Sequence, residues 1–198
     1  MQSLRNKTTV DVDPNVCISF AIGLLLLPLP WCIAWLTATA VHEAGHYVAL
    51  RLQKVSVYSV SIKCNRVLME TGVMTKKVEM ISALAGPVSG FLLLLCVRLF
   101  PRLAFCACIQ SLYNLLPIYP MDGGRALFGF LSSVMHISLA QRICTLTEYI
   151  VLGVAIIAAL YASIVLRLGA LPLLVASVLV LRRQQLKIPC KEGKLRVQ

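Results

Sequence analysis

Two histidines and a glutamate lie within five residues of one another, in the segment His42-Glu43-Ala44-Gly45-His46. Four positions are about one turn of an α-helix, so both imidazoles would point to the same side and could bind one metal ion. In this H-E-x-x-H pattern the glutamate stands beside the metal, where it can act as a general base toward water. We therefore predict that His42 and His46 are metal ligands and that Glu43 is a catalytic base.

The alternative is that both histidines are satisfied core side chains and that Glu43 is an ion-pair partner. The residues on the N-terminal side of this segment are apolar, and an ionisable residue inside a membrane span costs about 2.5 kcal/mol or more on insertion scales. Three such residues within five positions need a compensating partner. This favours a bound divalent cation.

A catalytic zinc ion generally has three protein ligands and one open position, so a third ligand is needed. Outside the N-terminal segment, the remaining candidates are His136, Glu70, Glu79, Glu148, Glu192 and Asp122. We favour Asp122 because two prolines end the apolar segment before it and two glycines follow it, which presents a carboxylate at a chain reversal. Its alternative role is the N-cap of a short helix over 124–134. We expect His136 to be an interfacial side chain with no role in the site.

The elements that carry these residues have the composition of a membrane protein. Of the 198 residues, 59% are hydrophobic and 14% are charged, and the mean hydropathy is +0.83. We predict an all-α membrane protein with about six transmembrane helices, over the apolar runs 16–28, 31–50, 78–97, 103–116, 146–166 and 168–181. The first run should stay in the membrane, since the polar segment before it lacks the layout of a signal peptide.

The distribution of basic residues predicts how the chain lies in the membrane. With both termini in the cytoplasm, all but three of the nineteen Lys and Arg residues fall on the cytoplasmic side, where such residues concentrate. The exceptions are Arg98, Arg102 and Arg167. Topology thus explains the net charge of +11, and we expect no nucleic-acid partner.

The same topology places the three predicted ligands at one depth. His42 and His46 lie toward the cytoplasmic end of the second span, and Asp122 follows the cytoplasmic end of the fourth, so the site should face the cytoplasmic side. We divide the chain into a membrane-embedded domain, 1–181, and a basic cytoplasmic tail, 182–198, which is either solvated or held on anionic lipid. The eight cysteines form no Cys-x-x-Cys pair, and we expect them to act as small apolar residues.

A small β-hairpin is predicted between the second and third spans. Residues 55–62 alternate Val, Tyr and Ile with Ser, and a second apolar segment, 68–73, follows a polar break. The edges of such a hairpin cannot lie bare in hydrocarbon, so it should lie at the surface or line a protein cavity. One edge could pair with an extended substrate, or the hairpin could be a simple surface flap.

Two of these motifs together resemble those of the site-2 proteases, zinc metalloproteases that cut peptide bonds within or near the membrane. Residues 42–46 match the first family motif. The segment from 114–117 to 122–123 matches the second motif, which supplies an Asn and a third metal ligand. The resemblance implies one Zn2+ per chain, bound by the two histidines and Asp122. Asn114 would be an oxyanion donor or a substrate-positioning group, with a helix–helix hydrogen bond as its alternative.

A third, minor motif departs from the family pattern. Ala85-Gly86-Pro87 looks like a family motif that often ends in Asn three residues on, and Gly90 stands there in this chain. This chain therefore has no Asn at the position where the family often has one. The departure does not involve a metal ligand.

The run Asn-Leu-Leu-Pro-x-x-Pro-Met-Asp-Gly-Gly, with its compact layout of spans, is most similar to the bacterial branch containing stage IV sporulation protein FB. This implies a membrane-associated precursor of a transcription factor as substrate, and small inhibitory membrane proteins as candidate partners. Members of that branch often carry a nucleotide-sensing CBS domain, which we do not expect in this chain. Two other functions stay open: a catalytically inactive zinc-binding membrane scaffold and a small transporter.

Overall fold

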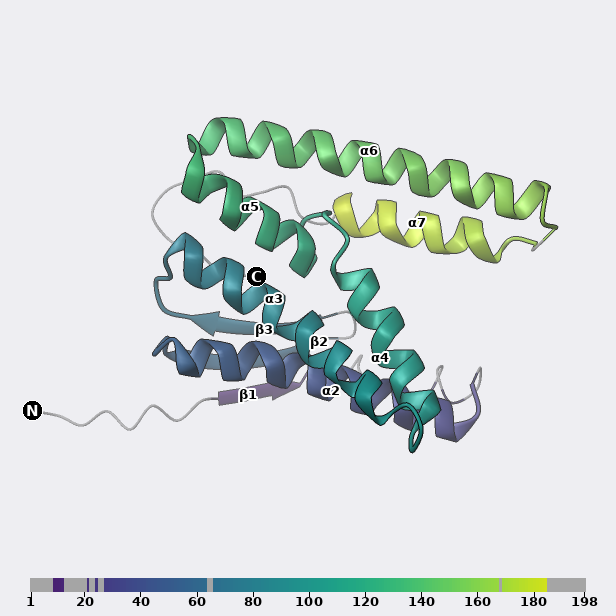
Figure 1. The fold of residues 1–198 in the computed structure, drawn as a ribbon, viewed down its shortest axis with the longest axis horizontal. Helices are drawn as coiled ribbons and strands as arrows, with labels where there is room; N and C mark the ends of the chain where they lie inside the picture. Colours follow the sequence, from purple (N-terminus) through teal and green to yellow (C-terminus); the bar gives the residue numbers. More distant parts are fainter. Residues whose placement is uncertain are drawn as a thin grey trace, which may run out of the picture.

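The structure, a computed structural model, describes residues 9–12, 21, 24, 27–63, 66–167 and 169–184. This part of the chain is mostly helical and contains one small sheet (Figure 1). In chain order, its elements are β1 (Thr9–Val12), α2 (Leu29–Leu52), β2 (Val57–Lys63), β3 (Arg66–Thr71), α3 (Lys76–Leu92), the 3-10 turn η1 (Leu93–Cys96), α4 (Pro101–Asn114), α5 (Asp122–Val134), α6 (Ile137–Ile164) and α7 (Leu171–Gln184).

Helix α2 carries the H-E-x-x-H segment. Pro30 lies in its first turn, where a missing N–H leaves no helical hydrogen bond unmade. After the helix, Lys54 takes a left-handed conformation with φ 58°. The amide of Val55 then donates to the Leu50 carbonyl (3.0 Å), which closes the helix end and turns the chain into the sheet.

The predicted hairpin is confirmed. β2 and β3 pair antiparallel, with Val60 opposite Met69, and the turn between them, residues 64–65, lies outside the described residues. β1 is a third strand that we did not predict, and it pairs parallel to β2 with Thr9 opposite Ser59. The strand order β1-β2-β3 leaves one side of β3 as an edge of the described sheet.

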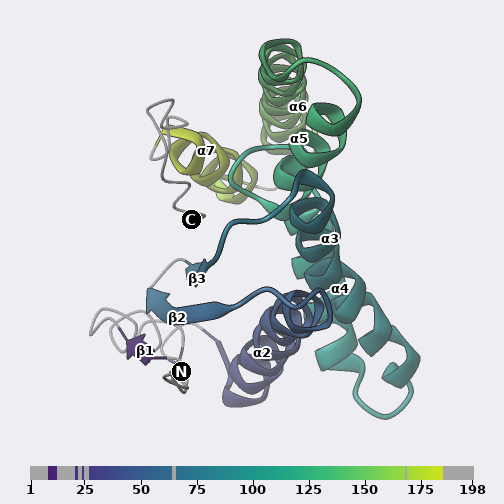
Figure 2. The same cartoon turned by 90° about the vertical axis from the view of Figure 1, so that its left-hand side faces the viewer.

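The helices and the sheet are arranged in two layers. Figure 2 shows α3, α4, α5 and α6 in one layer, with α7 and the sheet on the same side of it. Helix α2 packs against α3 and α4. Helix α5 also packs against α3. The two helices that carry the predicted metal ligands, α2 and α5, therefore both contact α3.

Small side chains let α2 and α4 approach closely. Ala34 and Ala38 of α2 pack with Cys106 and Ala107 of α4, and all four are buried. Close backbone approach through small residues is typical of helix pairs in membranes. Cys106 behaves here as a small apolar residue, as predicted.

Two helical segments in the described part of the chain are long and apolar enough to cross a membrane, Lys76–Cys96 and Ile137–Ile164. Only 28% and 22% of their most apolar windows are buried, unlike the core helix of a soluble protein. Helix α7 contributes a shorter apolar stretch, Pro172–Leu181. The layout of six spans stays a prediction, and most of its first span, 16–28, lies outside the described residues.

Some helix boundaries differ from the predicted spans. α6 begins at Ile137, well before the predicted start at 146. The prediction was late because Gln141 and Arg142 lower the local hydropathy, although they do not interrupt the helix. His136 caps α6, since its Nδ1 accepts a hydrogen bond from the Ser138 amide (3.4 Å). Helices α4 and α7 have 14 residues each, fewer than the roughly 20 that a perpendicular span requires.

Candidate metal site

Helix α2 places His42 and His46 one turn apart on the side that faces α3. Both side chains are buried, at 2% and 9% exposure. Their rings stand nearly perpendicular, at 82°, with centroids 4.9 Å apart, and their Nε2 atoms are 3.2 Å from each other. The predicted pairing of the two imidazoles is therefore present.

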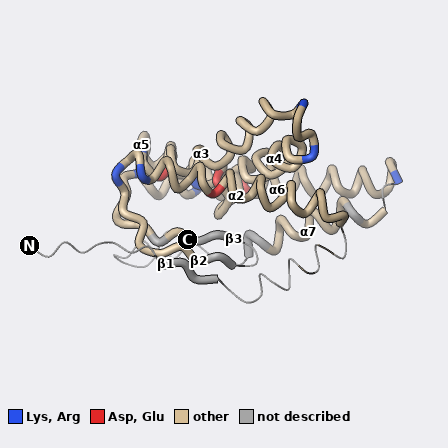
Figure 3. The backbone as a smooth tube through the Cα atoms, turned by 90° about the horizontal axis from the view of Figure 1, so that it is seen from below, with Lys and Arg blue, Asp and Glu red and all other residues tan. Residues whose placement is uncertain are grey.

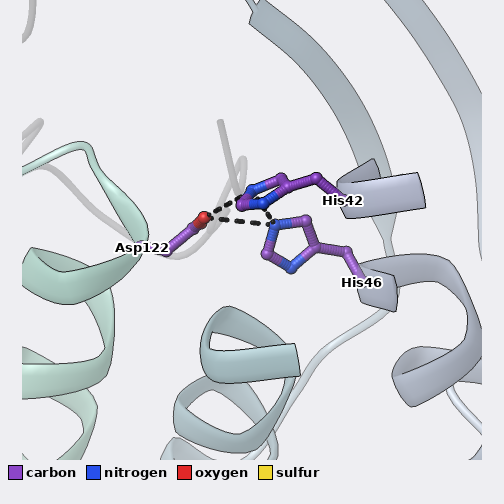
Figure 4. A group of neighbouring side chains, drawn as sticks. All are labelled: His42, His46 and Asp122. Atoms are coloured by element: carbon purple, nitrogen blue, oxygen red, sulfur yellow. Dashed lines mark hydrogen bonds and ion pairs between the residues drawn. The ribbon is translucent and has the colours of Figure 1, made fainter. Parts of the chain in front are cut away.

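Asp122 completes the group from the start of α5. Its Oδ2 lies 3.0 Å from His42 Nε2 and 3.2 Å from His46 Nε2. Figure 4 shows the carboxylate pointing at both rings, and Asp122 is 80 residues away from His42 in the sequence. The ligand atoms all lie within 4.8 Å of one another, so the three residues could bind a metal ion.

The donor set and its spacing fit zinc. Two imidazole nitrogens and one carboxylate oxygen are a combination that zinc takes in catalytic sites, leaving a position open. Zinc bonds of about 2.0–2.1 Å in a tetrahedral arrangement separate neighbouring ligand atoms by about 3.3 Å. The separations here are 3.0, 3.2 and 3.2 Å. A zinc ion could therefore be held with little movement of these side chains.

Asp122 is not the N-cap of α5. The capping position belongs to Met121, with no side-chain cap hydrogen bond. Among the other third-ligand candidates, Glu79 lies 3.5 Å from Lys76 and Glu148 accepts a hydrogen bond from the Tyr119 amide. Of the described residues, only Asp122 joins the histidines in a metal-sized group.

A backbone carbonyl fixes which nitrogen of His46 is available. His46 Nδ1 donates to the Ser82 carbonyl of α3 (2.7 Å), which leaves Nε2 unprotonated in the neutral ring and able to bind a metal. This contact was not predicted, because α3 is brought to α2 only by tertiary packing. His42 Nδ1 is buried and finds no hydrogen-bond partner among the described residues.

Gly86 makes room for the histidine pair. A Cβ at this position would lie 2.9 Å from His42 Nε2 and would overlap the ring of His46. The minor motif Ala85-Gly86-Pro87 therefore has a direct steric role: α3 approaches the site with no side chain in the way.

The Asp122 carboxyl is held in its ionised form. Asp122 follows the predicted fourth span and lies outside the spans. Burial by itself would raise its pKa, but the hydrogen bonds with His42 and His46 outweigh burial, so the pKa lies below its ordinary value. An ionised carboxylate is the form that binds a cation.

Asn114 also reaches the site. It is the last residue of α4, and its Nδ2 lies 3.2 Å from His42 Nε2. Its side chain is therefore beside the metal-ligand group rather than between helices away from it. The position is compatible with a hydrogen bond to a substrate held next to the metal.

Glu43 lies next to His42 in α2 and is half-buried. It interacts electrostatically with both histidines, Asp122 and Arg125. Arg125 was not predicted as a site neighbour, although it is three residues after Asp122, a spacing that places two side chains on one helix face. Its Nη1 lies 3.9 Å from Asp122 Oδ1.

The departure at Gly90 has a packing explanation. Gly90 on α3 faces Ser111 on α4, and a Cβ there would overlap the Ser111 Oγ. Ser111 is fully buried, at 0% exposure. A side chain at position 90 would require the Ser111 hydroxyl to give up its present position.

No protein-family model matches the chain, and no curated protein sequence does. A search of solved structures matches the site-2 protease from Methanocaldococcus jannaschii, with a TM-score of 0.62 and 17% sequence identity. The match covers 98% of this chain and 97% of that one. The chain therefore has the fold of that protein over almost its entire length, and together with the apolar helices this indicates a membrane protein.

Proposed function

We propose that this chain is an intramembrane zinc metalloprotease that hydrolyses a peptide bond of a membrane-associated substrate within or near the bilayer. The observation that carries the proposal is the convergence of His42, His46 and Asp122 from two distant helices at metal-ligand spacing. Glu43 stands in the base position of the H-E-x-x-H pattern. The fold shared with a site-2 protease supports the same reaction class.

The three ligands would hold one Zn2+ per chain. When bound, zinc lowers the pKa of water toward neutrality and polarises a carbonyl group, which is the chemistry that peptide hydrolysis requires. The protein's own part is to keep the ligand nitrogens deprotonated and the carboxylate ionised. The His46 Nδ1 bond to Ser82 leaves Nε2 as the unprotonated nitrogen of the neutral ring, and the contacts with His42 and His46 outweigh burial in keeping Asp122 ionised.

Glu43 would move the protons of the reaction. Its carboxylate takes a proton from the attacking water and delivers it to the nitrogen of the leaving amine, as a general base and then a general acid. Asn114 would donate a hydrogen bond from Nδ2 to the oxygen of the scissile carbonyl or hold the substrate strand in place. The Nδ2 position beside His42 supports this role.

The hairpin would supply the surface on which a substrate unwinds. A helical substrate hides its carbonyls, so it must become extended before it can be cut. β2 is paired on both sides, so the edges of the described sheet are β1 and β3, and an extended segment could add as a further strand at β3. The surface-flap alternative makes no use of this edge.

We further propose that the site faces the cytoplasm, with both termini on that side. The sporulation assignment rests on the resemblance of the 114–124 segment and of the predicted compact layout of spans to that branch. It makes a membrane-tethered transcription-factor precursor the first substrate to try, and small inhibitory membrane proteins the first partners.

The test is cleavage of a co-expressed, membrane-tethered candidate substrate by wild type and by Glu43→Gln. Loss of the base should reduce cleavage by about 100-fold or more while bound zinc and expression stay unchanged. Glu79→Gln is the matched control, because the same change is made at a carboxylate paired with Lys76 outside the site. Normal cleavage by Glu43→Gln would refute the base assignment.

A second variant separates binding of the metal from catalysis. Asp122→Ala should lower the zinc content of the purified protein, and unchanged zinc would remove Asp122 from the ligand set. A wild type that binds zinc but cleaves none of the candidates would favour the scaffold, and metal translocation in vesicles would favour a transporter.

A further inference from the structure

Glu148 is a buried carboxylate in the longest of the described helices. It lies within α6, in the apolar segment Ile137–Ile164, and is 8% exposed. Ionisable residues inside membrane segments are costly and usually have a function. The structure gives one contact that indicates what this function is: Glu148 Oε1 accepts a hydrogen bond from the backbone amide of Tyr119 (2.9 Å).

Tyr119 belongs to the segment that presents Asp122, residues 115–121, which we call the ligand loop. It joins α4 to α5. Pro117 and Pro120 have no N–H. Apart from Tyr119, the remaining amides of the loop donate to carbonyls of the loop itself or of α4. These bonds are Leu115 N to Ser111 O (3.0 Å), Leu116 N to Tyr113 O (3.3 Å), Ile118 N to Leu116 O (2.7 Å) and Met121 N to Ile118 O (2.8 Å).

The Tyr119 amide is thus the one amide of the ligand loop whose partner lies in neither the loop nor α4, the helix that precedes it. The loop also packs on α6 and α7 through apolar contacts, with Ile118 and Met121 against Leu152 and Leu179. Apolar contacts are non-directional and tolerate sliding. A hydrogen bond to a fixed carboxylate has a preferred distance and angle, so it sets where along α6 the loop is held.

We propose that Glu148 is a positioning residue that anchors the ligand loop to α6 through the Tyr119 amide. Asp122 follows Tyr119 by three residues, so this anchor would hold Asp122 at its distance from His42 and His46. The proposal rests on the metal site of the proposed function. Groups that orient metal ligands from outside typically change metal affinity by about 10–100-fold when they are removed. Glu148 does not belong to the metal-sized group itself.

Two variants of nearly equal size test the hydrogen bond. Glu148→Gln keeps an Oε1 acceptor, whereas Glu148→Met keeps the length of the side chain and removes the acceptor. Met is more favourable than Glu in a membrane helix, so a defect in Glu148→Met would not be a defect of insertion. Both are compared with wild type as full-length protein in detergent or nanodiscs.

The first measurement is hydrogen exchange of a peptide covering 115–121 in metal-free protein. Exchange should become faster in Glu148→Met and stay near the wild-type rate in Glu148→Gln. A role limited to general packing would not separate the two. The second measurement is zinc retention against a chelator, where Glu148→Met should lose zinc about tenfold more readily than wild type and Glu148→Gln should resemble wild type.

Unchanged exchange and zinc retention in Glu148→Met would overturn the proposal. Equal defects in Glu148→Gln and Glu148→Met would also overturn it, because the charge rather than the acceptor would then matter. A wild type that binds no zinc would end the proposed function instead, and the exchange comparison in metal-free protein would still decide whether Glu148 holds the loop.

Discussion

At the scale of single residues, neighbouring groups fix the positions of the three candidate ligands. Ser82 holds His46 in one orientation through Nδ1, and the absence of a side chain at Gly86 leaves space for both rings. Asp122 is already within 3.2 Å of both Nε2 atoms. Side chains held in this way would lose little freedom on binding a metal ion, which favours affinity.

Gly86→Ala tests this steric role. The added methyl group would overlap His46 and crowd His42, so we expect zinc retention to fall by at least about tenfold in chelator competition. Gly153→Ala on α6 is the matched control, since a Cβ there meets nothing within 4 Å. Both changes favour helix by about 1 kcal/mol. Equal zinc retention in the two variants would contradict the claim that a side chain at position 86 displaces the histidine rings.

Asn114→Ala tests whether this residue takes part in catalysis. We expect kcat for cleavage to fall about 100-fold with zinc content unchanged, because one hydrogen-bond donor toward the reacting oxygen is lost. Gln110→Ala is the control: Gln110 lies one turn earlier on α4 and bonds Thr39 of α2 (3.2 Å). If Asn114→Ala changes only thermal stability, as Gln110→Ala should, Asn114 is a helix–helix contact.

The metal-ligand group was predictable because its signals are local. His42 and His46 are one turn apart in any helix, and Asp122 is marked by the prolines and glycines around it. The contacts from Ser82, Asn114 and Arg125 have weaker sequence signals. The first two depend on how α3 and α4 pack against α2, which no spacing within one helix specifies.

At the scale of elements, the hairpin and most helices follow from residue patterns, whereas their limits do not. α6 extends through Gln141 and Arg142, since a helix interior tolerates polar residues that a hydropathy run does not. β1 was missed because it is four residues long and its partner β2 is far away in sequence. Parallel pairing of that kind leaves no local signature.

Strand addition at β3 can be tested by proline, which removes an N–H from one side of a strand. Successive amides of a strand point to opposite edges, so one of Leu68→Pro and Met69→Pro removes a donor toward β2 and the other a donor at the open edge. The variant that keeps wild-type thermal stability and zinc content identifies the open-edge position. We expect it to lose cleavage of a membrane-tethered substrate, and normal cleavage would favour the surface flap.

At the scale of the whole molecule, charge is separated along the long axis. Figure 3 shows the described Lys and Arg residues toward the two ends of this axis and the acidic residues between them. The end formed by the α6–α7 turn and the η1–α4 turn carries Arg167, Arg98 and Arg102, the three residues predicted to lie outside. The apolar helices thus lie between two basic ends, as expected for a membrane-embedded body.

This arrangement predicts the orientation of the chain. In a variant without native cysteines, Arg102→Cys should react with a membrane-impermeant maleimide added to intact cells, because the smaller basic end should face outward. Lys77→Cys, at the start of α3, should react only after the cells are permeabilised. Both positions are exposed, so access from the aqueous phase rather than burial decides the labelling. The reverse pattern would turn the molecule over and place the metal site nearer the outer face, where a cytoplasmic transcription-factor precursor could not reach it.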